Sequence, residues 1–287
     1  MAERFAQDRD RLGDLPVPSG VLAYALATMS QPDADLNDLA EVVRGEVSLA
    51  AQILRASNSA AMAARVEIFS VRDALARIGL LRARRLVIAL SLRSALTRWQ
   101  SPLPYDAFLA HSLGVANAAT LIAQAVKVPV STGPAADEAL YLGGLFHDVG
   151  LLVLARHYHR DYAAARSSAR DSGQALDRAE RDLFGSDHGE LGAMLVEGWG
   201  VPAVAVAAIA GHHHLERAPA EHRRAAQVLS LAEAISLSAG VPDLEEGVGA
   251  TTDGDAMAAL GLSPQDVETL ILATQASAHR DRLLLAA

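Results

Sequence analysis

Apolar residues recur every three or four positions along most of this chain, which is the spacing of helices that bury one face. In the first part, the pattern predicts helices over residues 21–29, 39–54 and 71–99. Gly45 is placed to break the second helix, and Ile78-Gly79 to bend or break the third. Asp35 or Asn37 is placed to cap the second helix.

The second part is helical by the same test. Its predicted helices cover residues 105–126, 136–158 running through His147-Asp148, 174–184, 188–199, 202–213, 225–239 and 264–285. Residues 241–255 are rich in glycine and acid and are predicted to form a surface linker. No alternating strand pattern and no internal repeat is found, so the pattern predicts an all-α chain.

Composition agrees with helices and narrows the chemistry. Of the 287 residues 51% are apolar, enough for a large core, while only 4% are aromatic and roughly one in five is alanine. There is no cysteine, which excludes disulfides, Cys-ligated zinc or iron–sulfur centres and a thiol nucleophile. Any metal chemistry must therefore use His, Asp and Glu.

Charge is unevenly spread along the chain. The formal net charge of −9 argues against bulk affinity for nucleic acid, yet residues 65–98 hold eight Arg against two acidic residues. The candidate group within this segment is Arg77, Arg82, Arg84 and Arg85. It is a candidate surface for phosphate, a nucleotide or an acidic partner. The alternatives are a solvated face or pairing with the acidic C-terminal segment.

The N-terminus is charged and lacks the apolar segment of a signal peptide. No run of 18 apolar residues is present. We therefore expect a cytoplasmic protein without a membrane segment.

The placement of the histidines is selective. The candidate ligands are His111, His147, Asp148, His188, His212, His213 and Glu233, and the histidines among them belong to four different predicted helices. Helices that converge in a bundle can direct such groups at one point. His111, His147, Asp148 and Glu233 suit a divalent ion such as Fe, Mn, Ni, Zn or Mg, and the other three histidines suit a second ion. Asp148 is the one catalytic candidate, and no organic cofactor is indicated.

Spacing alone leaves a second interpretation open. A histidine on an apolar helix is more often a hydrogen-bonded core residue than a ligand. Neighbouring side chains such as His147 and Asp148 also diverge when both lie on a helix. A Ser-His-Asp hydrolase is excluded, because no Gly-x-Ser-x-Gly turn follows a strand.

Ordered motifs carry a resemblance to a known family. They are LPVPSGVLAYALATM (15–29), ILRASNSAAM (53–62), IFSVRDALARIGLLRARRLV (68–87), HSLGVANAA (111–119), GGLFHDVGLLVL (143–154), Glu180-x7-His188-x3-Gly192, WGVP (199–202) and HHH (212–214). With these motifs, residues 15–239 resemble the HDOD family, the HD-related output domain of bacterial signalling proteins. That family is a divergent branch of the HD superfamily of metal-dependent phosphohydrolases.

The resemblance implies a two-lobed helical fold. An HDOD-specific N-terminal lobe would cover about 15–104 and an HD-like lobe about 105–238. A charged leader (1–14) would precede them, and an acidic linker with a C-terminal helix (239–287) would follow. Asn58-Ser59 would cap a helix or hydrogen-bond between the lobes.

The resemblance also implies a metal site, but one that lacks the lysine with which related enzymes hold the substrate phosphate. The superfamily pattern H…HD…D maps onto His111, His147, Asp148 and Glu233, with Glu in place of the last Asp. The further histidines of two-metal relatives map onto His188, His212 and His213. Cyclic-di-GMP phosphodiesterases of the HD-GYP type carry HDxGK and a Gly-Tyr-Pro motif, whereas here Leu151 follows Gly150 and no Gly-Tyr-Pro follows the His pair.

Three functions stay open at this point. The first is a signal-transduction output or scaffold module with a retained or vestigial metal site, acting through signalling protein partners or a nucleotide. The second is a metal-dependent phosphohydrolase that uses bound hydroxide on a nucleotide or cyclic dinucleotide. The third is nucleic-acid binding through the arginine group, which the net charge disfavours. The missing lysine favours the first.

Overall fold

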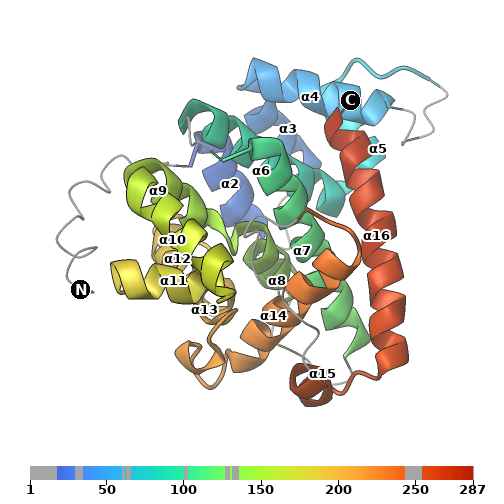
Figure 1. Cartoon of the computed structure of the whole chain (residues 1–287). Helices are drawn as coiled ribbons and strands as arrows, with labels where there is room; N and C mark the ends of the chain where they lie inside the picture. Colours follow the sequence, from blue (N-terminus) through green and yellow to red (C-terminus); the bar gives the residue numbers. More distant parts are fainter. Residues whose placement is uncertain are drawn as a thin grey trace.

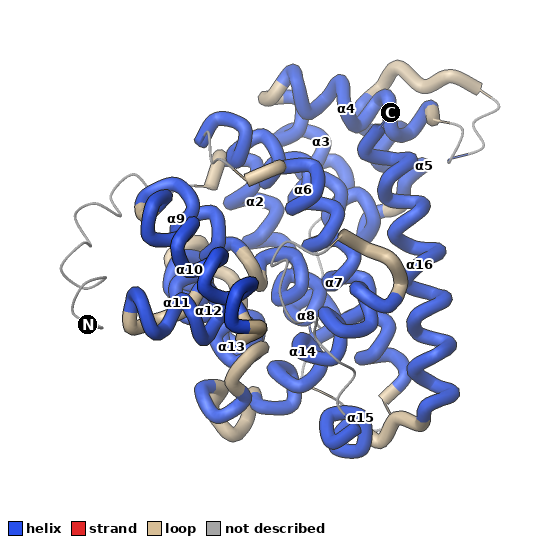
Figure 2. The backbone as a smooth tube through the Cα atoms, viewed as in Figure 1, coloured by secondary structure: helices blue, strands red, loops and turns tan. Residues whose placement is uncertain are grey.

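The protein is described from a computed structural model that covers residues 18–29, 35–59, 62, 66–99, 103–126, 130, 136–242 and 254–286. Within these residues every regular element is a helix, as the apolar spacing predicts. The helices form two lobes (Figures 1 and 2), joined where the last helix of the first lobe packs on the first helix of the second.

The first lobe is a set of helices that pack on one another. They are α2 (Gly20–Met29), α3 (Leu36–Arg44), α4 (Val47–Asn58), α5 (Val71–Ile78) and α6 (Leu80–Trp99). The predicted breaks at Gly45 and Gly79 are confirmed, while the helices predicted over 39–54 begin at Leu36 and end at Asn58. Asp35 caps α3 by accepting hydrogen bonds from two backbone N–H groups of the first turn. Gly79 separates α5 from α6 with φ of 88°, a backbone that other residues adopt only with strain.

Asn58 and Ser59 act inside this lobe. The Asn58 side-chain amide donates to the Ile68 carbonyl at 2.7 Å and accepts from the Ile68 N–H at 2.9 Å. Ser59 is the C-cap of α4, and its hydroxyl donates to the Ala56 carbonyl. The pair therefore caps α4 and closes the loop after it, and these hydrogen bonds do not join the two lobes.

The second lobe is built around α7, which packs against α8, α14 and α16. Its elements are α7 (Tyr105–Ala125), α8 (Ala136–Phe146), α9 (Val149–His157), α10 (His159–Ser172), α11 (Leu176–Phe184), α12 (His188–Glu197), α13 (Ala203–Gly211), the short 3-10 helix η3 (Leu215–Arg217), α14 (Arg223–Ser238), α15 (Gly254–Leu260) and α16 (Pro264–Ala286). The C-terminal helix α16 runs along one side of the molecule, beside α7 (Figure 1). Most of the predicted linker, residues 243–253, lies outside the described residues.

Three local features differ from the sequence-based expectation. The stretch 136–158 is two helices, because His147 and Asp148 form a turn between α8 and α9. Pro202 is the N-cap of α13 and not its first residue. Helices α10 and α15 were not predicted. Helix α10 is polar, although its buried Tyr162, Ala165 and Ala169 follow helical spacing.

Glycines let the helices of the second lobe approach closely. A Cβ on Gly144 of α8 would lie 2.5 Å from the backbone of Ala116 in α7. A Cβ on Gly150 of α9 would lie 2.0 Å from the carbonyl oxygen of His188 in α12. No side chain fits at such distances, so these glycines allow the histidine-bearing segments to meet.

Two stretches, Tyr105–Ala125 and Asp137–His157, are long and apolar enough to cross a membrane by composition alone. They are 67% and 94% buried inside the protein. Burial by other helices explains their apolar character, as expected for core helices.

Candidate metal centre

Six of the predicted ligands gather at one place in the second lobe. We call this group, His111, His147, Asp148, His188, His212 and His213, the histidine cluster. His111 comes from α7, His147 and Asp148 from the turn between α8 and α9, His188 from the first position of α12, and the last two from the end of α13. All except His213 are at most 1% exposed.

The turn at His147-Asp148 is what allows both residues to serve one site. Asp148 has φ −98° and ψ 7°, outside the helical range. On a continuous helix the two side chains would diverge by about 100°. Here they converge, since His147 Nε2 lies 3.2 Å from Asp148 Oδ1.

The cluster has two halves with Asp148 between them. His111, His147 and Asp148 offer ligand atoms within 4.8 Å of one another, and so do His188, His212 and His213. The Asp148 carboxylate is 3.4 Å from His111 Nε2 in the first half and 3.6 Å from His188 Nε2 in the second. One carboxylate thus faces both halves.

Four of the imidazoles are held at Nδ1, which turns their Nε2 atoms inward. Nδ1 of His111 contacts the Pro242 carbonyl at 2.8 Å, Nδ1 of His147 the Gly144 carbonyl at 2.8 Å, and Nδ1 of His212 the Ile209 carbonyl at 2.6 Å. Nδ1 of His188 lies 2.8 Å from the buried carboxylate of Glu180. A carbonyl oxygen only accepts, so Nδ1 carries the proton and Nε2 keeps its lone pair in the neutral ring. Protein ligands to metals are commonly oriented by such outer partners.

The Nε2 atoms then meet in pairs. His111 and His147 bring theirs to 3.1 Å, and His188 and His213 to 2.9 Å. Two neutral rings protonated at Nδ1, as in the first pair, would face each other lone pair to lone pair. That arrangement is repulsive unless a proton or a metal ion lies between them.

Protonation equilibria in the cluster favour an anionic Asp148. Burial alone would raise the pKa of Asp148, but His147, His111 and His188 outweigh it and hold this pKa well below its ordinary value. Burial lowers the pKa of His147, and Asp148 reverses the effect so that the net shift is upward. Burial and three neighbouring histidines hold the pKa of His212 well below its ordinary value, which keeps this ring neutral, the form that binds metals.

The unsatisfied atoms fit a divalent cation. Both Asp148 oxygens and Nε2 of His212 are buried and make no aligned hydrogen bond. A buried acceptor without a donor is unfavourable. A cation would satisfy these atoms together, and imidazole with carboxylate is a donor set for Fe, Mn, Ni or Zn.

Two acidic residues stand beside the cluster. Glu233 of α14 is 5% exposed, and its charge contributes to the upward pKa shift of His147. Its role as a ligand stays a prediction. Glu180 of α11 is the first residue of the Glu180-x7-His188-x3-Gly192 motif. It is fully buried and accepts hydrogen bonds from the backbone N–H and Nδ1 of His188, so it positions that ring.

The four arginines of the predicted surface have different surroundings. Arg77 donates to the carbonyl oxygens of Ser57 and Val66. Arg84 is buried, at 8% exposure. Arg85 pairs with Glu138 of α8 at 2.6 Å, while Arg82 is exposed and lines a cavity with Arg85.

A second group of ligand-type residues lies next to the histidine cluster and was not predicted. Asp177, Asp187 and His214 offer atoms within 4.8 Å of one another. Asp187 accepts from Arg181 at 2.7 Å and from Arg217 at 2.6 Å, and it caps α12 through the Glu190 N–H. We call these five residues, Asp177, Asp187, His214, Arg181 and Arg217, the arginine-paired cluster.

Comparison with known proteins agrees with this architecture. A family model for the HDOD domain matches residues 15–215. A protein of Treponema pallidum (strain Nichols) is 26% identical over 230 residues, which are 75% of this chain but only 40% of that relative. The chain therefore spans less than half of that relative's length.

Solved structures share the fold. A protein of Marinobacter aquaeolei VT8, provisionally named a signal transduction protein, has a TM-score of 0.77 and 25% identity, covering 96% of this chain and 60% of that one. A protein of Shewanella amazonensis SB2B, provisionally named a phosphohydrolase, has a TM-score of 0.72 and 22% identity, covering 96% and 97%. An HDOD domain protein of Geobacter sulfurreducens has a TM-score of 0.71 and 22% identity, covering 96% and 89%.

Proposed function

Because this chain belongs to the HDOD family, we propose that it is a signal-transduction module whose histidine cluster binds one or two divalent metal ions. The observation that carries the proposal is the inward set of Nε2 atoms, four of them on rings held at Nδ1 and two pairs facing at 3.1 and 2.9 Å. We further propose that it acts in the cytoplasm through protein partners.

The positions of the donor atoms suggest which residues would hold each ion. His111, His147 and Asp148 would hold one ion, and His188, His212 and His213 a second, with Asp148 facing both. Glu180 would orient His188 from behind. A bound divalent ion can polarise a phosphoryl oxygen and supply hydroxide at neutral pH.

Burial supports binding over hydrolysis. The Asp148 carboxylate is fully buried, and of the six cluster residues only His213 is more than 1% exposed. A phosphodiester would have to displace packed helices to reach the carboxylate. The absence of a lysine after Gly150 also removes a cation that would hold the phosphate. A metal in this position would stabilise the arrangement of α7, α9, α12 and α13, which a partner can recognise.

Metal analysis tests the proposal. The purified full chain should contain Fe, Mn, Ni or Zn, and His147→Ala should lose the ion of the first half while His213→Ala loses that of the second. His159→Gln, an exposed histidine at the start of α10, is the matched control and should keep the wild-type content. Wild-type protein that takes up none of these metals after dialysis against each of them would refute the proposal.

A substrate screen decides between a binding module and the phosphohydrolase alternative. Metal-loaded wild type, His147→Ala and Asp148→Ala would be compared on phosphodiesters and nucleotides with added Mn or Fe. We expect no turnover from any of the three. Turnover by wild type that is lost in both variants would establish the hydrolase, for which the position of Asp148 between the two halves is the favouring observation.

A further inference from the structure

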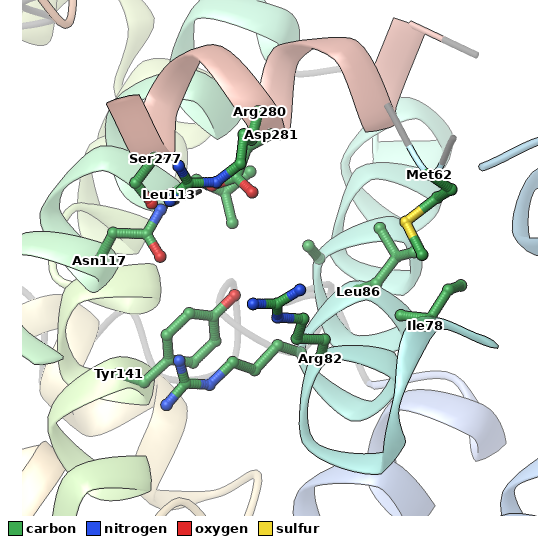
Figure 3. A pocket seen from close by; sticks show the side chains of 12 residues that line it. Met62, Ile78, Arg82, Leu86, Leu113, Asn117, Tyr141, Ser277, Arg280 and Asp281 are labelled. Atoms are coloured by element: carbon green, nitrogen blue, oxygen red, sulfur yellow. Dashed lines mark hydrogen bonds between the residues drawn. The ribbon is translucent and has the colours of Figure 1, made fainter. Parts of the chain in front are cut away.

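A cavity of about 200 Å³ lies between the two lobes, away from the histidine cluster. Its wall is formed by α5 and α6 of the first lobe, α7 and α8 of the second, and the C-terminal helix α16 (Figure 3). None of the six cluster residues lines it.

One side of the cavity is apolar. Ile78 and Leu86 supply this side from α5 and α6, while Leu113 of α7 lies across the cavity beside Asn117 and Ser277 (Figure 3). The other side is polar, and its groups come from both lobes, including α16 of the second (Figure 3). Ligand sites typically combine an apolar lining with a few convergent polar groups.

The polar side favours an anion. Arg82 and Arg280 are exposed at the cavity and make no ion pair or hydrogen bond with the described part of the chain. Arg85 differs, since Glu138 accepts from it at 2.6 and 3.1 Å and its guanidinium lies 4.3 Å from the Tyr141 ring centroid. Glu138 therefore neutralises Arg85, which leaves the guanidiniums of Arg82 and Arg280 as the positive charge of the cavity.

The C-terminal helix already places one carboxylate here. Asp281 of α16 accepts a hydrogen bond from the Asn117 side chain at 2.6 Å. It lines the same cavity as both free arginines. Asn117 is thus one donor at this cavity that can hold an acidic group.

We propose that this interlobe cavity binds a small organic anion, a carboxylate or phosphate carried on an apolar body. Arg82 and Arg280 would bind the acidic group, and guanidinium is the side chain best shaped for a planar or tetrahedral oxyanion. Leu86 and Leu113 would contact the apolar body. The volume is below the range of about 300–1,000 Å³ that holds drug-sized ligands, so a single ring or a short chain fits.

Phenyl phosphate is the probe, measured by calorimetry on the full chain with a chelator present. The chelator removes metal from the histidine cluster, so phosphate binding there does not contribute. We expect a dissociation constant below about 1 mM. Arg82→Gln and Arg280→Gln should each weaken binding about tenfold, the size of one charge-assisted hydrogen bond. Arg178→Gln, an exposed arginine on α11, should bind as wild type does.

Asp281→Asn is the variant expected to gain affinity. It removes the carboxylate that competes for the arginines while its amide oxygen can still accept from Asn117. We expect binding to tighten severalfold. Three results would each overturn the proposal: no binding of phenyl phosphate, equal binding of the neutral benzyl alcohol, or unchanged affinity in both arginine variants. If inorganic phosphate bound as tightly as phenyl phosphate, the proposed contact of Leu86 and Leu113 with the apolar body of the ligand would be refuted.

Discussion

Two clusters of acidic and histidine side chains meet at the start of α12, and they balance charge in opposite ways. His188, the first residue of α12, belongs to the histidine cluster, while Asp187 just before it belongs to the arginine-paired cluster. The ion-pair partners of Asp148 within the described chain are all histidines. Asp187 instead has two guanidiniums within 2.7 Å.

This difference shows why ligand-type residues alone do not define a metal site. Both clusters bring three such residues within 4.8 Å. In the arginine-paired cluster Asp187 already faces two cations, so a metal ion would be repelled by Arg181 and Arg217. In the histidine cluster the positive charge has to come from protons or from a metal. The arginine-paired cluster instead fastens the segment before His188 to the segment after His213.

The largest effect is expected from breaking the arginine-paired cluster. Asp187 is 1% exposed, caps α12 and pairs with Arg181 and Arg217. Removing one partner of a buried ion pair costs about 3–5 kcal/mol. Because the two arginines keep some contact with water, Asp187→Ala should lower the free energy of unfolding by about 3 kcal/mol in urea titrations.

Asp187→Asn separates the two roles of this residue. Its amide oxygen can still cap α12, so it should lose less stability than Asp187→Ala. The loss in Asp187→Ala should be the same with metal or with chelator. A loss that appears only in the metal-bound protein would mean that Asp187 serves the histidine cluster and that the two clusters are not independent.

Metal should stabilise the protein through one cluster only. Zinc at about 100 times its dissociation constant should add about 2.7 kcal/mol to the free energy of unfolding. His188→Gln should reduce this gain because it removes a ligand from the second half. His214→Gln is the matched control, since His214 contacts Asp177 at 2.8 Å in the arginine-paired cluster.

Thermal unfolding with and without zinc measures both variants. We expect the zinc-induced increase in melting temperature to persist in His214→Gln and to shrink in His188→Gln. The reverse result would place the metal in the arginine-paired cluster.

Close helix approach is the next feature to test. A Cβ on Gly150 would lie 2.0 Å from the His188 carbonyl oxygen, so Gly150→Ala must push α9 away from α12. Overpacking of this kind costs about 1–3 kcal/mol, and we expect about 2 kcal/mol. The displacement would also separate Asp148 from His188, so metal content should fall.

Gly143→Ala provides the control on α8. Its Cβ would meet ordinary contacts at 3.7–3.9 Å. Alanine also favours a helix over glycine by up to about 1 kcal/mol. The variant should therefore be as stable as wild type or more so, with full metal content. Equal losses of stability and metal content in both variants would mean that the close approach of α9 to α12 is not their cause.

Much of this architecture could be predicted from the sequence because its causes are local. Apolar spacing located most helices, and short-range chemistry located some of their ends, as at Asp35 and Gly79. The ligand set came from the placement of the histidines on different predicted helices and from the family motifs that map onto it. The structure brings six of those seven residues together, with Glu233 buried beside them.

The remaining features depend on contacts between distant residues. The His147-Asp148 turn lies inside a continuous apolar stretch, so periodicity alone predicted one helix there. The arginine-paired cluster joins Asp187 to Arg217 and Asp177 to His214, which are 30 and 37 residues apart. No short motif connects such pairs. The interlobe cavity likewise needs α6 and α16 to lie on two sides of one space, and no pattern in either helix predicts the other as its neighbour.

The smallest effect is expected at Asp281. Its surroundings are intermediate between those of Asp148, which faces histidines, and those of Asp187, which pairs with arginines. No arginine of the described chain is within ion-pair distance of it, although three contribute to its electrostatics. Burial raises the pKa of Asp281, and the Asn117 hydrogen bond and the charges of Arg280, Arg85 and Arg82 oppose this shift.

A raised pKa in the folded state means that ionised Asp281 destabilises the fold above that pKa, and that the penalty disappears below the unfolded value of about 3.9. Asp281→Asn should therefore be more stable than wild type at pH 7, and urea titrations should show the difference shrinking as the pH falls toward 4. A variant less stable than wild type at pH 7 would mean that the arginines outweigh burial and that Asp281 belongs with Asp187.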